Sequence, residues 1–288
     1  MGLWFDLLKE YSLRRLSFES DRLNAISALA ERLSRMLQDE YIGGIWKKDL
    51  PTCLQWSHSY EDGHLHATRQ RACGAPTWSW ASVGYSPESQ GGVVVDSVYT
   101  TGEGAPLVRL VDLQWQPKSD RNKFGDLSKA RITLSGRLLR GYAYPRKGGP
   151  DVWKEMVTMT EELDELPREK IKHHPDYNSE GYKRYAATFG DRWWLHVCGK
   201  RLGQRARLIM MMFPDTGDCV EEGFLYLLPL ADYSAPGQAD STLLDRQSGR
   251  LFGLVLKELK DGTFERVGCI RVFAKYLMTA KERSIVLV

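Results

Sequence analysis

Three ionisable residues in one short segment are the first candidates for chemistry. Glu61, His64 and His66 surround an Asp-Gly turn signal at 62–63, which separates two candidate strands. A two-residue turn would pair Glu61 with His64 and Ser59 with His66, all on one face of the hairpin. A carboxylate and two imidazoles there suit acid–base catalysis or a divalent metal. The alternative interpretation is a hairpin tip whose side chains are simply solvated. A three-residue turn would also shift the strand register, so that these side chains would no longer share one face.

Two further groups of residues carry weaker catalytic signals. His173 and His174 lie near Asp176 in a polar stretch, where a surface loop and a lid that delivers a general acid are both open interpretations. His196 and Cys198 alternate onto one face of a candidate strand. Packing in the core explains this second pair, since a thiolate nucleophile needs a positive and partly exposed environment.

A basic cluster follows in the sequence. It consists of Lys200, Arg201, Arg205 and Arg207, with Trp193 and Trp194 nearby. A phosphate or a nucleic-acid backbone would fit this cluster, but so would a charged turn beside a strand, and no RNP-like or helix-turn-helix context surrounds it. The formal net charge of +3 is also mild for a protein that binds nucleic acid or a membrane surface. We therefore expect neither partner.

The common cofactor and hydrolase motifs do not occur. The sequence has no P-loop, no G-x-S-x-G, no H-E-x-x-H and no dinucleotide G-x-G-x-x-G after a strand. Their absence argues against nucleotide-driven, serine-hydrolase and zinc-protease activities. We expect no cofactor and no resident metal, although a barrel mouth can assemble a site from residues far apart in sequence.

The elements that must position these residues begin with a helical segment over 1–43, packed on the main domain. The pattern at 3–8 predicts a short amphipathic helix. A second helix is expected after the capping residues Ser20 and Asp21, and Gly43-Gly44 is expected to end it. Apolar residues recur there at steps of three and four, namely Leu23, Ile26, Ala30, Leu33 and Leu37. The opposite face is expected to meet water and carries Arg22, Glu31, Arg32, Arg35 and Asp39.

A β-rich domain is expected over 44–288. Candidate strands with turn residues between them lie at 54–60, 64–69, 93–95, 107–115, 131–140, 193–198, 207–213, 224–230, 251–258, 266–272 and 284–288. Asp261-Gly262 marks a tight turn. Most connections are too short for crossover helices, so we predict a twisted antiparallel β-barrel or sandwich. A large polar, partly helical insertion at about 144–191 interrupts it. The predicted fold class is α+β, mainly β.

Residues 78–83, Trp-Ser-Trp-Ala-Ser-Val, are the most distinctive stretch. With a period of two, Trp78 and Trp80 would stand side by side on one face of a strand and bury a large apolar area. Pro76 suits the first residue of a strand or an edge strand. We expect the two indoles to be buried scaffolding, so that any activity resides in polar groups brought together elsewhere.

A longer set of residues around this stretch carries a family resemblance. The set comprises Ser12, Arg14-Arg15-Leu16, Ser20-Asp21-Arg22-Leu23, Tyr41, Gly44-Ile45-Trp46, Leu50, Leu54, Trp56 and Ala75-Pro76-Thr77-Trp78-Ser79-Trp80-Ala81-Ser82-Val83. In order and spacing it resembles the region that follows the HET domain in fungal heterokaryon-incompatibility proteins. The aromatic S-Y-C-W-G type segment of the HET domain itself has no counterpart here. The resemblance therefore implies a stand-alone relative of that C-terminal region, without the cell-killing activity of the HET domain.

Two functions of different classes follow from these observations. The first is a binding module whose aromatic-lined cleft holds a small apolar molecule or a protein partner. Its candidate ligand-binding residues are Trp46, Trp56, Trp78, Trp80, Trp194 and His196. The alternative is a cofactor-independent cyclase, isomerase or lyase of fungal secondary metabolism, which would combine shape with proton transfer by His64, His66 or Glu61. A deep pocket with an ionisable side chain would favour the enzyme, and a shallow surface patch would favour the binder.

Cysteine usage and hydropathy bear on the compartment. The five cysteines are scattered and form no C-x-x-C pair, which is typical of a reduced compartment. The longest apolar run worth noting, 208–213, is far shorter than a membrane span. The N-terminus lacks the pattern of a signal peptide. We expect a cytoplasmic protein.

Overall fold

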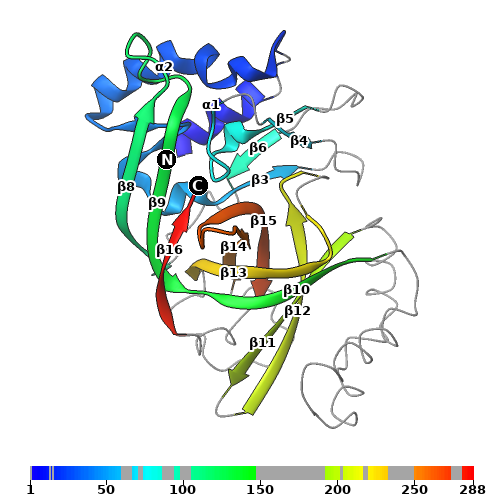
Figure 1. Ribbon diagram of the computed structural model, residues 1–288. Helices are drawn as coiled ribbons and strands as arrows, with labels where there is room; N and C mark the ends of the chain where they lie inside the picture. Colours follow the sequence, from blue (N-terminus) through cyan, green and yellow to red (C-terminus); the bar gives the residue numbers. More distant parts are fainter. Residues whose placement is uncertain are drawn as a thin grey trace.

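The described part of the chain is mainly β and contains two α-helices, in agreement with the predicted fold class. The computed structural model describes residues 2–12, 14, 16–59, 67–70, 74–85, 94–97, 105–146, 192–201, 204–216, 220–232, 250–273 and 281–288. Figure 1 shows the helices at one end of the molecule and the long strands extending away from them. Short 3₁₀ turns also occur, namely η1 (Glu19–Asp21), η2 (Lys47–Asp49), η3 (Thr52–Leu54) and η5 (Trp80–Ser82).

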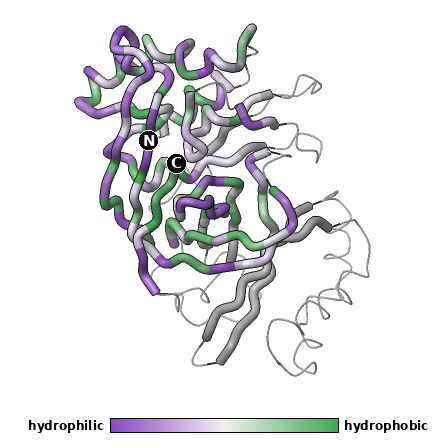
Figure 2. The backbone as a smooth tube through the Cα atoms, viewed as in Figure 1, coloured by the Kyte–Doolittle hydropathy of each residue, from purple (hydrophilic) through white to green (hydrophobic). Residues whose placement is uncertain are grey.

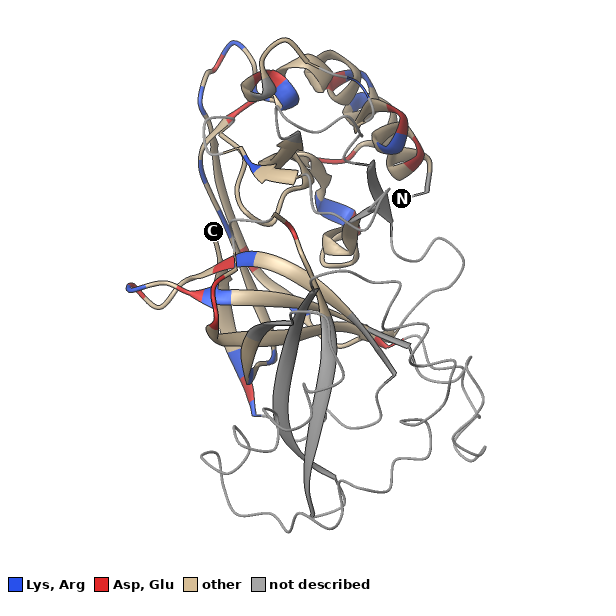
Figure 3. Ribbon diagram, turned by 90° about the vertical axis from the view of Figure 1, so that its right-hand side faces the viewer, with Lys and Arg blue, Asp and Glu red and all other residues tan. Residues whose placement is uncertain are grey.

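The two predicted N-terminal helices are confirmed as α1 (Gly2–Ser12) and α2 (Arg22–Leu37). Their buried apolar residues are Trp4, Phe5 and Leu8 of α1 and Leu23, Ile26 and Ala30 of α2, all part of one hydrophobic core with the sheet. Positions of both charge signs lie over the outer surface of the helices (Figure 3). Asp21 takes the predicted N-cap position of α2, but its side chain makes no capping hydrogen bond.

Two details of α2 differ from the prediction. Arg22 was expected to face water but is 1% exposed, because it lies where α1 and α2 meet and the Tyr11 hydroxyl donates a 2.7 Å hydrogen bond to its carbonyl oxygen. The helix also ends before Gly43-Gly44, since Gln38 adopts the left-handed conformation at its C-cap.

Gly43 and Gly44 instead form the turn of a small hairpin. They connect β1 (Tyr41–Ile42) to β2 (Ile45–Trp46), and both have positive φ, +52° and +103°, as a two-residue hairpin turn requires. The carbonyl oxygen of Gly44 accepts hydrogen bonds from the indoles of Trp80 at 2.7 Å and Trp4 at 3.1 Å. The hairpin therefore joins α1 to the tryptophan segment.

The long strands form one large sheet. They are β8 (Arg109–Pro117), β9 (Leu127–Arg137), β10 (Leu139–Arg146), β11 (Arg192–Arg201), β12 (Gln204–Pro214), β13 (Gly223–Asp232), β14 (Arg250–Glu258), β15 (Phe264–Phe273) and β16 (Glu282–Leu287). Their order is β12-β11-β10-β13-β14-β15-β16-β9-β8, and β7 (Ala105–Pro106) pairs with β13. β12 also pairs with β15, and only the β15–β16 pair among the described strands is parallel. The predicted Asp261-Gly262 turn lies between β14 and β15.

Hydropathy along the chain follows this arrangement. Hydrophobic stretches concentrate in the middle strands of the sheet, whereas the turn between β8 and β9 is hydrophilic (Figure 2). Leu228, Leu254 and Ile285 have no exposed surface and belong to the core shared with the helices. The middle strands are buried on both faces, since residues 227–231 of β13 and 252–256 of β14 are all buried.

The short strands pair differently from the predicted hairpin. β3 (Trp56–Ser59) pairs with β6 (Val94–Ser97), and β4 (Ala67–Arg69) pairs with β5 (Val83–Tyr85). The described parts of the two expected hairpin strands therefore pair with later segments of the chain. The hairpin turn and most of the insertion, 147–191, lie outside the described residues.

Residues 78–82 are not a strand, which corrects the period-two interpretation. Trp78 lies in a turn and Trp80–Ser82 form η5. The Ser79 hydroxyl accepts a hydrogen bond from the amide of Ala81 at 3.1 Å, and the Ser82 hydroxyl donates to the Ser79 carbonyl at 2.7 Å. The serine side chains thus form hydrogen bonds with nearby backbone groups, which favours a turn over the inter-strand hydrogen bonding of a β-strand. The expected burial is confirmed, since Trp78 and Trp80 are both 0% exposed.

A polar contact fastens α2 to the turn between β8 and β9. Asp126 accepts hydrogen bonds from the Asn24 amide at 3.2 Å and the Lys118 ammonium at 3.4 Å. Desolvation nevertheless raises the pKa of Asp126 above its usual value, and the nearby Asp21 adds to the shift. The ionised carboxylate is therefore less favourable in the folded chain than in the unfolded one.

Substituting Asp126→Asn tests this contact through its pH dependence. A carboxyl whose folded pKa is raised stabilises the fold below its unfolded pKa of about 3.9, and that contribution is lost as the pH rises through the folded value. The stability of Asp126→Asn relative to the natural protein should therefore increase between pH 4 and pH 7, measured by urea unfolding. A relative stability that falls over this range would contradict the assignment.

A Gly44→Ala substitution tests the hairpin turn. A Cβ at this position would lie 2.6 Å from the Trp80 indole nitrogen and 2.9 Å from the Ser79 hydroxyl, at a φ that disfavours alanine. We expect the free energy of unfolding to fall by about 2–4 kcal/mol. Gly262→Ala is the control, because its φ is +78° but no atom lies within 4 Å of the added Cβ. For Gly262→Ala we expect the free energy of unfolding to fall by about 1 kcal/mol. If both variants lost the same free energy of unfolding, the steric explanation for Gly44 would be excluded.

Candidate functional site

The predicted catalytic set lies outside the described residues. Glu61, His64 and His66 fall in the stretch 60–66, and the histidines of the insertion fall in 147–191. Their roles remain predictions. Among the described residues, no group of three His, Cys, Asp or Glu side chains is arranged to hold a metal ion.

Four of the predicted ligand-binding tryptophans lie in the core. Trp46 is 2% exposed, and Trp56, Trp78 and Trp80 have no exposed surface. The Trp56 indole donates a 2.9 Å hydrogen bond to the Trp78 carbonyl oxygen, and Trp46 packs edge to face with Trp4 and Tyr41. These contacts show the rings packed against protein groups, as expected for scaffolding.

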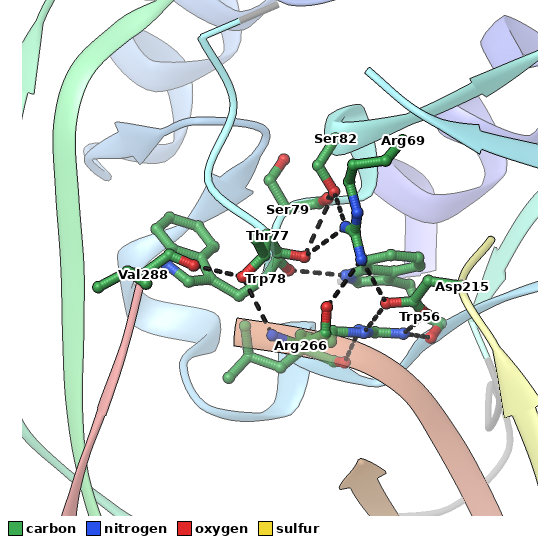
Figure 4. Close-up of polar contacts among 10 residues, drawn as sticks. Trp56, Arg69, Thr77, Trp78, Ser79, Ser82, Asp215, Arg266 and Val288 are labelled. Atoms are coloured by element: carbon green, nitrogen blue, oxygen red, sulfur yellow. Dashed lines mark hydrogen bonds and ion pairs between the residues drawn. The ribbon is translucent and has the colours of Figure 1, made fainter. Parts of the chain in front are cut away.

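A buried ion pair lies next to the tryptophans and was not predicted. Arg266 of β15 is 0% exposed and forms two hydrogen bonds with the Asp215 carboxylate, of 2.9 and 3.0 Å. Its remaining guanidinium hydrogens reach the carbonyl oxygens of Leu54 at 2.9 Å and Trp56 at 2.7 Å. The guanidinium carbon also lies 3.4 Å from the centre of a Trp56 ring (Figure 4). This cation is held by a carboxylate, two carbonyls and an aromatic face.

A second guanidinium completes the network. Arg69 donates to the Arg266 carbonyl oxygen at 2.7 Å and to the Ser82 hydroxyl at 2.7 Å, and it lies 3.8 Å from Asp215. Thr77 joins the same group, because its hydroxyl accepts from the Arg266 amide at 3.1 Å and donates to the Val288 carbonyl oxygen. The network therefore connects the tryptophan segment with β15 and the end of β16 (Figure 4).

The environment of this network suits a structural role. The side chains of Arg266 and Asp215 are 0% and 2% exposed, so neither presents a reactive group to solvent. The carboxylate of the group, Asp215, accepts two hydrogen bonds from Arg266 and lies 3.8 Å from Arg69, so its oxygens are engaged by protein groups. We assign the network to the scaffold.

One group of aromatic side chains at the surface lies on β10 and β13. We call Arg140, Tyr142, Phe224 and Tyr226 the aromatic face. The register pairs Tyr142 with Phe224 and Arg140 with Tyr226. Phe224 is 49% exposed, whereas the alternating Leu225 and Leu227 are buried at 3% and 0%. The aromatic face therefore lies on the side of β13 opposite Leu225 and Leu227. Farther along β13 this side continues into the buried Leu228 and Leu230, and Tyr226 packs edge to face on the core residue Phe264.

Contacts within the aromatic face hold its rings in place. The Arg140 guanidinium carbon lies 3.8 Å from the centre of the Phe224 ring, and Tyr142 meets that ring edge to face at 5.3 Å. The Tyr142 hydroxyl donates to Glu222 at 3.3 Å, and the Tyr226 hydroxyl donates to Glu258 at 2.7 Å. The bond to Glu258 raises the pKa of Tyr226, so its hydroxyl stays protonated at neutral pH.

Two of the predicted ligand-binding residues, Trp194 and His196, lie on β11, and the structure describes only their backbone. β11 pairs with β10 so that His196 is opposite Tyr142 and Trp194 is opposite Tyr144. Their role in binding remains a prediction. The sequence contained part of the signal for the aromatic face, because Arg140, Tyr142 and Tyr144 alternate with Leu139, Gly141 and Ala143. The partner strands could not be assigned from that alternation alone.

Comparisons with protein-family models, with curated proteins and with solved structures returned no match to the chain. The HET-like resemblance therefore remains an expectation from the sequence. In the part of the chain that the structure describes, neither helix is long and apolar enough to cross a membrane.

Substituting Asp215→Asn tests the structural assignment. The change leaves two buried guanidiniums without their carboxylate, so we expect the free energy of unfolding to fall by about 3–5 kcal/mol. Glu31→Gln is the matched control, because Glu31 pairs with Arg35 on the surface of α2, where the side chains are 46% and 76% exposed. That change should cost less than about 0.5 kcal/mol. Urea unfolding followed by tryptophan fluorescence measures both, and equal effects would refute the assignment.

Proposed function

We propose that the protein is a binding module that recognises its partner through the aromatic face of β10 and β13. The observation that carries this proposal is the exposure of Phe224, at 49%, within a group of side chains already held by mutual contacts. Aromatic residues and arginine are enriched at the energetic centres of interfaces. A ring that is fixed before binding also loses little side-chain entropy when a partner covers it.

The rim of the aromatic face supports the same function. Glu222 and Glu258 accept hydrogen bonds from its tyrosines, and Lys257 forms a 3.7 Å ion pair with Glu221. Polar pairs thus surround an apolar centre, which is the usual arrangement of a protein binding site. An exposed surface group of this kind is the feature expected of a binder.

The wider proposal is that β10–β15 close into a barrel. The pairings run from β10 through β11, β12, β15, β14 and β13 and return to β10. Gly268 supports close packing where β12 meets β15, because a Cβ there would lie 2.6 Å from the Phe213 carbonyl oxygen. A barrel of six strands is narrower than the eight-stranded barrels that hold one small ligand. Its outer face, not its interior, would then serve for binding.

The sequence resemblance fits a recognition role. If the chain is a stand-alone relative of the region after the HET domain, a binding function is easier to retain than the effector activity of the missing domain. The alternative, a cofactor-independent cyclase, isomerase or lyase, rests on His64, His66 and Glu61, which lie outside the described residues. It remains a prediction from the sequence.

A Phe224→Ala substitution tests the proposed function. Immobilised natural protein and variant would be incubated with an extract of cells that express the protein, and the retained molecules quantified by mass spectrometry and nucleic-acid staining. We expect at least one component to be retained by the natural protein and reduced tenfold or more by the variant, since an aromatic centre of an interface contributes about 2 kcal/mol or more.

Val111→Ala is the control for this experiment. Val111 of β8 is also 49% exposed but lies outside the aromatic face, so its variant should retain the same component. Thermal unfolding would verify that both variants fold. Retention that is unchanged by Phe224→Ala would contradict the proposed function.

A further inference from the structure

Positive charge is concentrated in the hairpin of β8 and β9. Residues 109–137 contain seven Lys or Arg and three Asp, a net charge of +4 in a chain whose total is +3. The mild overall charge that argued against a nucleic-acid partner is therefore an average over an uneven distribution. Figure 1 shows β8 and β9 side by side, reaching from the large sheet to the helices, with their connecting turn beside α2.

The half of this hairpin nearer the turn is a two-stranded ribbon. β8 is the edge strand of the large sheet, and β16 pairs with β9 only over 132–137. Between Ile132 and the turn, β9 therefore pairs with β8 alone among the described strands. Strands of a sheet are about 4.8 Å apart, so two strands with their side chains fit the major groove of a DNA duplex, which is about 12 Å wide.

The two faces of the ribbon differ in composition. Its inner side chains pack against the hydrophobic core, namely Leu113, Trp115 and Ala130. On the outer face the register pairs Gln114 with Arg131 and Gln116 with Lys129, and all four side chains are exposed. We call these four residues the ribbon face. It contains no apolar side chain, so hydrophobic contact is not what it offers a partner.

The ribbon face has the side chains that read base edges. Arg and Lys donate hydrogen bonds to guanine, and the Gln amide both donates to and accepts from adenine. The Gln114 amide donates a 2.7 Å hydrogen bond to Asp112, and its carbonyl oxygen is an acceptor besides. Among the described ion pairs, none involves Lys129 or Arg131. Their charges are therefore directed to solvent or to a partner.

The turn beyond the ribbon supplies two more cations. Arg121 and Lys123 are both exposed. The backbone that carries them is fastened to α2, because the Asn122 amide donates to the Asn24 carbonyl oxygen at 3.1 Å and to the Ser27 hydroxyl at 3.3 Å. Cations next to a base-reading ribbon are placed to contact the phosphates that border the groove.

The acids of this region do not cancel the charge. Residues 112–131 contain five Lys or Arg and three Asp, namely Asp112, Asp120 and Asp126. Asp126 is only 9% exposed and accepts a hydrogen bond from Lys118. Hydrogen bonds from Thr263 and, to a lesser extent, the charge of Arg131 lower the pKa of Asp261 in the neighbouring turn. The exposed cations of 112–131 still outnumber its exposed acids.

We propose that the β8–β9 ribbon binds duplex DNA in the major groove. The ribbon face meets the base edges, and Arg121 and Lys123 meet the phosphates. The major groove of an RNA duplex is too deep and narrow for side chains to read. An anionic membrane surface calls for apolar side chains among the cations, which the ribbon face lacks. The site is separate from the aromatic face, so the inference goes beyond the proposed function.

Fluorescence anisotropy with a labelled DNA duplex of about 20 base pairs tests the proposal. In 50 mM salt, we expect the natural protein to bind this duplex at least tenfold more tightly than it binds either single strand or an RNA duplex of the same sequence. Arg121→Gln combined with Lys123→Gln should weaken binding to every DNA sequence roughly tenfold. It should also lower the slope of log affinity against log salt by about 2, because two phosphate contacts are lost.

Lys281→Gln combined with Arg283→Gln is the charge control. Both residues are exposed at the beginning of β16, which pairs with the end of β9 farther from the turn, at Gly136 and Arg137. This variant loses the same charge in the same sheet. Its affinity for the duplex and its salt slope should equal those of the natural protein.

A Gln116→Ala substitution tests the reading of bases. Selection from a library of random duplexes by the natural protein should yield a preferred sequence. The variant should lose about tenfold of the preference at one base pair and keep its salt slope, because it removes a base contact and no charge. Thermal unfolding would verify that each variant folds.

Three results would each overturn the proposal. The first is the absence of binding to duplex DNA at 100 µM protein, including the case in which phosphatidylserine vesicles or polyglutamate bind instead. The second is an equal loss of affinity in the two double variants, which would mean that the position of the charge is irrelevant. The third is binding of single strands or of duplex RNA as tight as that of duplex DNA.

Discussion

The buried guanidinium of Arg266 is the interaction on which the arrangement of the other elements depends. An unpaired charge in the interior is very costly, so this side chain requires the carboxylate of Asp215 and the carbonyls of Leu54 and Trp56 in fixed positions. Those partners come from two segments that are distant in sequence from β15, which carries Arg266. The cation therefore fixes the relative positions of β15, the residues after β12 and the stretch before β3.

The same constraint explains the conformation of the tryptophan segment. Arg69 and Arg266 bind the backbone and hydroxyl groups of Thr77 and Ser82. The segment between Thr77 and Ser82 then forms a compact turn with both of its indoles inside. The network lies in the interior, and the residues of the aromatic face on β10 and β13 do not take part in it. Their aromatic side chains are available for recognition, and changes there leave the buried ion pair intact.

Prediction from sequence succeeded where the pattern is local. The apolar spacing of α2 identified that helix, apolar runs separated by turn residues identified the long strands, and the Asp261-Gly262 signal identified a turn. It failed where local hydrogen bonds compete with the pattern. Ser79 and Ser82 turn the chain at the indoles, and Gln38 ends α2 so that Gly43-Gly44 can form a hairpin.

The candidate site was harder to predict because it depends on register between distant strands. Arg266 and Asp215 are 51 residues apart, and Arg266 and Trp56 are 210 apart, so no spacing rule relates them. Trp194 and His196 were selected as candidates, but their neighbours Tyr142 and Phe224 were not. Alternation predicts which residues of one strand share a face, whereas strand order decides which faces combine.

The contact between Thr77 and Val288 has a consequence for biosynthesis. Thr77 binds the Val288 carbonyl through both its amide, at 3.2 Å, and its hydroxyl, and the two residues are 211 positions apart. During translation, the tryptophan segment leaves the ribosome long before β16 exists. The packing around its indoles cannot be completed until nearly all of the remaining chain has been synthesised. Until then, these apolar rings are covered either by α1 and the β1–β2 hairpin or by chaperones.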